Sequence, residues 1–110
     1  MKSRDLLKRA ARLMRELFGR GVDFCGYRSR LPDGSIVWNC GLFEAECDDY
    51  GEPLGDVTVL AAADAPDMAA ACDEALRRFF SCDDLPPQLS GLGSAEELEL
   101  RLEVLEGGLP

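Results

Sequence analysis

The N-terminal segment from Ser3 to Phe18 has apolar residues at every third or fourth position. This period predicts an amphipathic helix with one buried stripe, which ends at the glycines at positions 19 and 21. The residues of the stripe are Leu6, Leu7, Ala10, Leu13, Met14 and Leu17.

Three β-rich segments follow the predicted helix. Residues 22–29 and 36–47 flank a turn that contains Pro32 and Gly34, so they are predicted to form an antiparallel hairpin. Large apolar residues occupy both faces of the second strand, and the pattern leaves open which face is buried. Residues 48–56 are predicted to be a loop because of their Gly, Pro and Asp content, and residues 57–63 to be a third strand.

A second helix is predicted directly after the third strand. Asp64 serves as the N-cap, Pro66 lies in the first turn, and the carboxylate of Asp67 follows the cap by three residues. The predicted buried stripe consists of Met68, Ala71, Cys72, Ala75, Leu76 and Phe79.

The C-terminal part gives two conflicting signals. Residues 82–94 are rich in proline, glycine and aspartate and are predicted to be an extended connector. Ser94 and Glu97 have the spacing of a helical capping box, whereas the next apolar residues alternate strictly with charged ones, as in a strand. These apolar residues are Leu98, Leu100, Leu102 and Val104. We predict a fourth strand here, with a helix as the alternative, and a tail over residues 107–110.

Together the elements predict one α+β domain over residues 1–110, in the order α-β-β-β-α plus a C-terminal fourth strand. The sheet is expected to be antiparallel, with the helices packed on one face. No apolar run approaches the roughly 18 residues that a membrane span needs, and no signal peptide is recognisable. We therefore expect a cytoplasmic protein that does not bind membranes.

Charge is distributed unevenly along the chain. Residues 1–31 contain nine basic and three acidic side chains, a net charge of +6, whereas the remainder carries a net charge of −15. Four basic residues of the first helix fall along one face and form a basic ridge, which consists of Arg4, Lys8, Arg12 and Arg15. Net charge informs about partners more than about fold, so this division is the main indication of function.

The composition argues against catalysis. Histidine, the commonest acid–base group, is absent, and no phosphate-binding loop motif is present. The five cysteines show no close metal-ligand pairs and are expected to be reduced and buried. The acidic loop around residues 46–56 could hold Ca²⁺, but a solvated hairpin loop is preferred. We expect no enzymatic activity, no metal and no cofactor.

The predicted order of a helix, three strands and a helix over residues 3–80 resembles the double-stranded-RNA-binding domain. That family holds phosphates with lysines at the start of its last helix, and this chain has acidic residues there instead, namely Asp64, Asp67, Asp73 and Glu74. Carboxylates repel phosphates, so direct nucleic-acid binding through this surface is not expected.

The acidic surplus suggests binding to a basic protein. An anionic surface can occupy a site built for nucleic acid, because the basic site needs negative charge and matching shape. In this respect the chain is similar in composition to small phage inhibitors of nucleic-acid machinery, including anti-CRISPR proteins. The resemblance implies a DNA mimic that acts in a bacterial or phage-infected cell. The predicted partner-binding residues are Glu44, Glu46, Asp48, Asp49, Glu52, Asp56, Asp83 and Asp84.

Two other functions stay open on the sequence. One is a small acidic chaperone or adaptor subunit, of the type III secretion kind, that binds a partner peptide. The other is a nucleic-acid-binding module that uses the basic ridge. A surplus of carboxylates that only keeps the domain soluble is the simplest alternative to all three.

Overall fold

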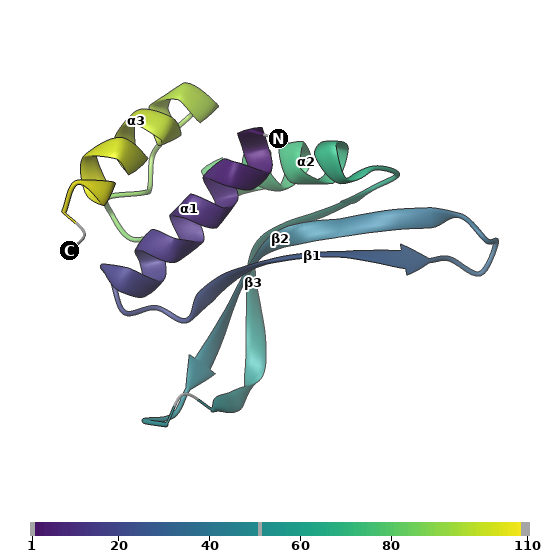
Figure 1. Cartoon of the computed structure of the whole chain (residues 1–110), viewed down its shortest axis with the longest axis horizontal. Helices are drawn as coiled ribbons and strands as arrows, with labels where there is room; N and C mark the ends of the chain where they lie inside the picture. Colours follow the sequence, from purple (N-terminus) through teal and green to yellow (C-terminus); the bar gives the residue numbers. More distant parts are fainter. Residues whose placement is uncertain (1, 51, 109–110) are drawn as a thin grey trace.

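The chain folds as a single α+β domain in which a three-stranded antiparallel sheet packs against helices (Figure 1). The computed structural model describes residues 2–50 and 52–108. The element order is α1 (Lys2–Glu16), β1 (Val22–Arg30), β2 (Ile36–Cys47), β3 (Pro53–Ala65), α2 (Met68–Phe80) and α3 (Ala95–Glu106). The first helix, the hairpin and the third strand are confirmed, whereas the C-terminal element differs from the prediction.

The C-terminal segment is a helix and not the predicted fourth strand. The Ser94 side chain accepts a hydrogen bond from the backbone N–H of Glu97, so the capping-box signal was the correct one. As a helix, the segment buries Leu98 and Leu102 completely, while Leu100 and Val104 stay 65% and 74% exposed. The alternation was misleading because only every second one of these apolar residues is buried, namely Leu98 and Leu102, which lie about one helical turn apart.

The second helix also begins later than predicted. Strand β3 continues to Ala65, with Asp64 paired to Asn39, so the N-cap is Asp67 instead of Asp64. The Asp67 carboxylate accepts from the N–H of Ala70 at 2.8 Å. The long third strand likewise shortens the predicted loop over residues 48–56, because β3 already begins at Pro53.

The sheet has one covered and one open face. Cys40 and Leu42 of β2 and Ala63 of β3 are buried beneath the helices, whereas Val57 and Val59 of β3 are more than half exposed. The buried face of β2, which the sequence pattern had left open, is therefore the face that carries Cys40 and Leu42. The buried faces of α1 and α2 meet the covered face, and α3 packs on α1 as an outer element (Figure 1).

The two ends of the sheet point in different directions (Figure 1). Strand register shifts between Leu42 and Phe43, where an irregularity of the β-bulge kind bends a strand. Glycine is needed next to it, because a Cβ at Gly41 would clash with the carbonyl oxygen of Ala61. The bend leaves the β2–β3 end of the sheet extending away from the helices.

The predicted connector of residues 82–94 is irregular, as expected, but it contributes to the core. Pro86, Leu89 and Leu92 are buried there. Of the predicted tail of residues 107–110, Gly107 and Gly108 follow α3 directly, and residues 109–110 lie outside the described residues.

Candidate functional site

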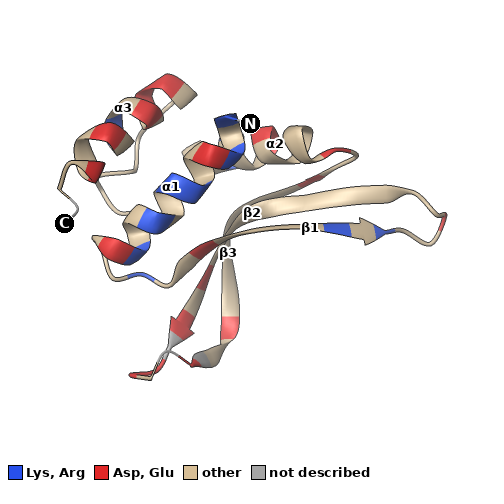
Figure 2. Cartoon of the chain, viewed as in Figure 1, with Lys and Arg blue, Asp and Glu red and all other residues tan. Residues whose placement is uncertain are grey.

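Acidic residues gather at the β2–β3 end of the sheet, which extends away from the helices (Figure 2). Alternation along the strands places Glu44 and Glu46 of β2 on the same face as Asp56 of β3. This face borders an open depression of about 420 Å³, which we call the acidic groove. Its lining residues are Glu44, Glu46, Leu54, Asp56, Thr58 and Asp84. Carboxylates therefore dominate the groove, with the exposed Leu54 as an apolar contact within it.

Arg20 neutralises the inner end of the acidic groove. Its guanidinium donates to both carboxylate oxygens of Glu44, at 2.8 and 2.6 Å, and lies 3.5 Å from the carboxylate of Asp84. The hydrogen bonds from Arg20 lower the pKa of Glu44, and the same pair raises the pKa of Arg20. Glu44 is therefore committed to its pair with Arg20, and it is the least available to a partner among the predicted partner-binding residues.

Asp48 organises the hairpin turn. Its carboxylate accepts from the backbone N–H groups of Tyr50 and Glu52, each at 2.9 Å. Its own N–H donates to the carbonyl of Glu52 at 2.9 Å. The charge of Asp48 stays at the surface, but its side chain is committed to the turn, so substituting it would disturb the hairpin.

Four predicted carboxylates are left available to a partner at this end. Glu46, Asp49, Glu52 and Asp56 are exposed. None of the four forms an ion pair within residues 2–50 and 52–108. Asp83 is also exposed but does not line the acidic groove, whereas its neighbour Asp84 does.

The basic ridge is more occupied than the sequence suggested. Arg12 contacts Glu16 at 3.2 Å, and Arg15 contacts Asp23 at 3.2 Å. Arg15 also donates to the carbonyl of Val22 at 2.8 Å. The ammonium of Lys8 lies 5.6 Å above the ring centre of Phe24. Only Arg4 of the four has neither an ion pair nor a ring contact among the described residues.

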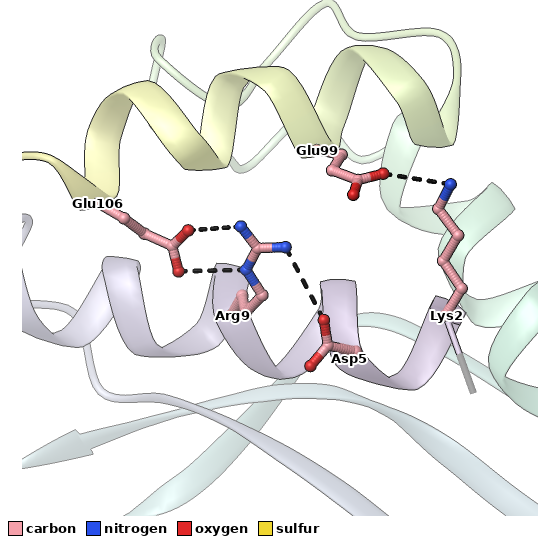
Figure 3. Close-up of polar contacts among 5 residues, drawn as sticks. All are labelled: Lys2, Asp5, Arg9, Glu99 and Glu106. Atoms are coloured by element: carbon pink, nitrogen blue, oxygen red, sulfur yellow. Dashed lines mark hydrogen bonds and ion pairs between the residues drawn. The ribbon is translucent and has the colours of Figure 1, made fainter.

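Basic residues outside the ridge hold α3 against α1 (Figure 3). Arg9 donates to both carboxylate oxygens of Glu106, at 3.1 and 2.5 Å, and Lys2 lies 3.1 Å from Glu99. The hydrogen bond from Arg9 lowers the pKa of Glu106. These contacts pair N-terminal cations with C-terminal anions, so part of the charge division is used inside the domain.

The cysteines are not uniformly buried as predicted. Cys40 and Cys72 are buried, Cys82 is partly buried, and Cys25 is exposed on β1; the side chain of Cys47 lies outside the described residues. Burial, reinforced by the neighbouring Cys40 thiol, raises the pKa of Cys72 to about 12. This thiol is therefore protonated at neutral pH and is a poor nucleophile.

Trp38 is partly buried and packs against the cluster of Cys40, Ala71 and Cys72. Within the described residues, no three His, Cys, Asp or Glu side chains are grouped as metal ligands would be. No helix in this part of the chain is long and apolar enough to span a membrane.

Comparisons with known proteins add no assignment. No family model matches the chain, and neither the curated proteins nor the solved structures contain a significant match.

Sequence reasoning missed two residues at the acidic groove, namely Arg20, which pairs with Glu44 and Asp84, and Leu54, which lines the groove. Arg20 stands between Gly19 and Gly21, and a lone arginine held in a tight turn could have been noticed as a fixed cation. Leu54 was assigned to a loop, and its role became visible only when the longer β3 placed it beside the carboxylates.

Proposed function

We propose that the protein is a non-enzymatic binding protein whose acidic groove and hairpin tip occupy a basic, nucleic-acid-binding site on a larger protein. The observation that carries this proposal is the cluster of exposed carboxylates that form no ion pair among the described residues, at an end of the sheet that projects from the domain. We place its action in the cytoplasm, in the manner of the phage-type inhibitors that act as DNA mimics.

The β2–β3 hairpin supports charge mimicry better than one strand would. Acidic residues on one strand face repeat about every 6.7 Å, about twice the phosphate spacing along a DNA strand. Glu46 and Asp56 come from neighbouring strands, which lie about 4.8 Å apart. Together with Asp49 and Glu52 at the tip, they form an array denser than a single strand provides.

The shape of the groove adds a requirement for the partner. Leu54 is 62% exposed between the carboxylates. A lysine or arginine side chain matches such a surface, because its aliphatic stem can cover Leu54 while its charged end meets Glu46 or Asp56. We therefore expect the partner to present long basic side chains and not only a diffuse positive field.

A pair of matched variants tests the proposal. Glu46→Lys with Asp56→Lys changes the charge of the acidic groove by four, and Glu96→Lys with Glu103→Lys makes the same change on exposed positions of α3. The tagged proteins are used to capture partners from a bacterial lysate at low and high salt, followed by mass spectrometry. We expect basic nucleic-acid-binding proteins to be captured at low salt only, because exposed charge interactions are screened.

The affinity for the captured partner should fall at least tenfold in the groove variant, and less than threefold in the α3 variant. Short DNA or RNA should compete with the protein for the partner. Equal losses in both variants, or capture that persists at high salt, would contradict the proposal, since either result would mean that the groove is not the contact.

The other two functions have less support. The nucleic-acid-binding module would use the basic ridge, but Arg12 and Arg15 already pair with carboxylates. The peptide-binding adaptor would need an apolar surface, and the open face of the sheet is such a surface. That function would leave the exposed carboxylates of the acidic groove without a role.

A further inference from the structure

Strand β1 forms one edge of the sheet, whose strand order is β1-β2-β3 (Figure 1). At one end of the β1–β2 pair, the N–H of Leu31 donates to the carbonyl of Ser35 at 2.8 Å. At the other end, the N–H of Ala45 donates to the carbonyl of Gly21 at 3.1 Å. Bonded and non-bonded pairs alternate along an antiparallel ladder, so the odd-numbered residues between these ends bond to β2. The N–H and C=O groups of the even-numbered residues of β1 therefore face outward.

Side chains close only the first part of this outer edge. The guanidinium of Arg15 donates to the carbonyl of Val22 at 2.8 Å, and the N–H of Phe24 donates to the carboxylate of Asp23 at 2.9 Å. Beyond the N–H of Phe24, the outward backbone groups have no hydrogen-bond partner within the described part of the chain. An edge in this state is a template on which another extended chain can pair. The even-numbered residues of this open part of the edge are Gly26, Arg28 and Arg30.

The open part of the edge is basic (Figure 2). Side chains alternate along β1 and Arg28 is paired with Trp38, so Arg28 and Arg30 lie on the face of the sheet that carries Phe24 and Trp38. Both arginines are exposed, and neither forms an ion pair with any residue that the structure describes. Two available cations thus stand on the same residues whose backbone groups are available.

We propose that the open part of β1 binds an extended acidic segment of a partner protein, which pairs with the edge as an additional strand. In this mode of recognition, main-chain hydrogen bonds give affinity and side chains at alternate positions give specificity. Carboxylates at alternate positions of the segment repeat about every 6.7 Å, as Arg28 and Arg30 do. Opposite charges in cross-strand positions stabilise the pair. We therefore expect an acidic residue at every second position of the segment.

The positions between the carboxylates have a different neighbour. They lie beside Tyr27, which is 50% exposed on the other face of the strand. A β-branched residue suits this neighbour, because aromatic and β-branched residues pair well across strands. The arginines also select against pairing between two β1 edges, since that would bring both pairs of arginines to one seam. The edge thus favours an acidic segment over a second copy of itself.

The net charge of −9 does not prevent binding at this edge. Glu46 of the acidic groove lies eight residues along β2 from Trp38, the cross-strand partner of Arg28, which corresponds to about 26 Å of strand. Exposed charges are largely screened beyond about 8 Å at physiological salt. The basic edge and the acidic groove are therefore separate surfaces. Binding at the edge goes beyond the proposed function and does not depend on it.

Fluorescence anisotropy with a labelled peptide tests the proposal. The probe is a synthetic peptide of about seven residues in which glutamate alternates with valine, long enough to cover the open part of the edge. We expect saturable binding with a dissociation constant below about 1 mM. Arg28→Glu with Arg30→Glu should weaken binding at least tenfold. Arg12→Glu with Arg77→Glu makes the same change of charge on exposed cations of α1 and α2 and should weaken it less than threefold. Circular dichroism checks that both variants are folded.

Backbone pairing needs a test of its own. Arg28→Pro removes an N–H that faces away from β2, a position at which edge strands tolerate proline. It should abolish binding, whereas Arg28→Ala, which keeps the N–H, should bind at least tenfold more tightly than the proline variant. Amide exchange measured by NMR gives a second readout on wild type. The N–H groups of Gly26 and Arg28 should exchange faster than those of Cys25 and Tyr27, and the peptide should slow the exchange at Gly26 and Arg28.

Absence of saturable binding up to about 1 mM overturns the proposal, and so do equal losses in the two double variants. Equal binding of polyglutamate, without slower exchange at Gly26 and Arg28, overturns strand pairing, because charge alone would then attract the peptide. An oligonucleotide that binds the edge more tightly than the peptide would reassign the arginines to nucleic acid. Glu46→Lys with Asp56→Lys should bind the peptide as wild type does, and a loss there would overturn the separation of the two surfaces.

Discussion

The contact between α1 and α3 and the end of the β2–β3 hairpin are both rich in charge, but they use it differently. Between the helices, Arg9 holds Glu106 in a bidentate pair that is mostly shielded from solvent. At the hairpin end, neither Glu46 nor Asp56 forms an ion pair among residues 2–50 and 52–108, and the nearby Arg20 is engaged by Glu44. The same residue types thus stabilise the fold in one region and remain available for binding in the other.

This difference limits what net charge can say about a protein. The division into a basic and an acidic part of the sequence is real, but the fold brings Lys2 and Arg9 against Glu99 and Glu106. Charge that is paired inside the domain does not reach a partner. The carboxylates without an ion pair among the described residues include Glu46 and Asp56 at the hairpin end, and they also include Glu96 and Glu103 on α3.

The largest expected effect is a loss of stability when the packing between α1 and α3 is disturbed. Leu102 of α3 is fully buried, and Leu102→Ala should lower the free energy of unfolding by about 2–5 kcal/mol through the lost burial and the cavity left behind. Val104→Ala, two residues away and 74% exposed, should change it by less than about 0.5 kcal/mol. Urea denaturation measures both. Similar losses in the two variants would show that α3 does not pack as described.

Reversing one charge in each region compares the two directly. Glu106→Lys places a cation beside Arg9, whose side chain is only 24% exposed, and should cost about 1–2 kcal/mol of stability. Glu46→Lys at the hairpin should leave stability within about 0.5 kcal/mol of wild type, because no folded-state pair is broken. Thermal unfolding of the two variants gives the comparison. A hairpin variant that is the less stable of the two would contradict the division into structural and available charge.

The pH dependence of stability should come from the paired carboxylates. Arginine partners keep the pKa of Glu44 and Glu106 below the ordinary value of 4.5 in the folded protein. Their contribution is therefore fully present above about pH 4.5 and is lost as the pH falls through the lower folded pKa values. Unfolding midpoints measured between neutral pH and pH 3 should fall steeply for wild type and less steeply for Arg9→Met and Arg20→Met. An unchanged slope in both variants would show that these pairs are not responsible.

The smallest effect concerns the thiols of the two sheet faces. Cys25 is exposed on the open face, whereas Cys72 is buried with its pKa raised to about 12. Iodoacetamide at pH 8 should modify Cys25 readily and Cys72 only in denaturant, because the thiolate is the reacting form. Peptide mass spectrometry distinguishes the two sites. Modification of Cys72 at the rate of Cys25 would mean that the covered face opens to solvent.

Prediction from the sequence succeeded for those elements whose local residue pattern and whose packing in the folded protein favour the same structure. The stripe of α1 from Leu6 to Met14 and the turn at Gly34 were correct because periodicity and turn chemistry are local properties, whereas Leu17, the last residue of the predicted stripe, lies beyond the end of α1 and is exposed. The segment after Ser94 was wrong because its alternating leucines fit a strand, while burial against α1 requires only Leu98 and Leu102. The pattern cannot show which neighbours a segment will have.

The candidate site was predictable in location but not in detail. The acidic residues between positions 44 and 56 were identified from charge alone, and they do gather at one end of the sheet. Long-range pairing decided which of them are available: Arg20 engages Glu44 from 24 residues away. Asp48 is committed locally, through the turn it builds. Neither contact leaves a period or motif in the sequence.

The β2–β3 hairpin that carries the acidic groove is a single layer of backbone. Its carboxylates lie on one side, and Val57 and Val59 lie on the other side beside their cross-strand neighbours Ala45 and Phe43. Its register is therefore critical, because a shift of one residue moves every side chain to the opposite face. The irregularity between Ala45 and Cys47 sets that register for the end of the strand. Inserting a single residue into β3 directly after Asp56 would shift the residues before it by one position, which moves Leu54 and Asp56 to the open face while Val57 and Val59 keep their places.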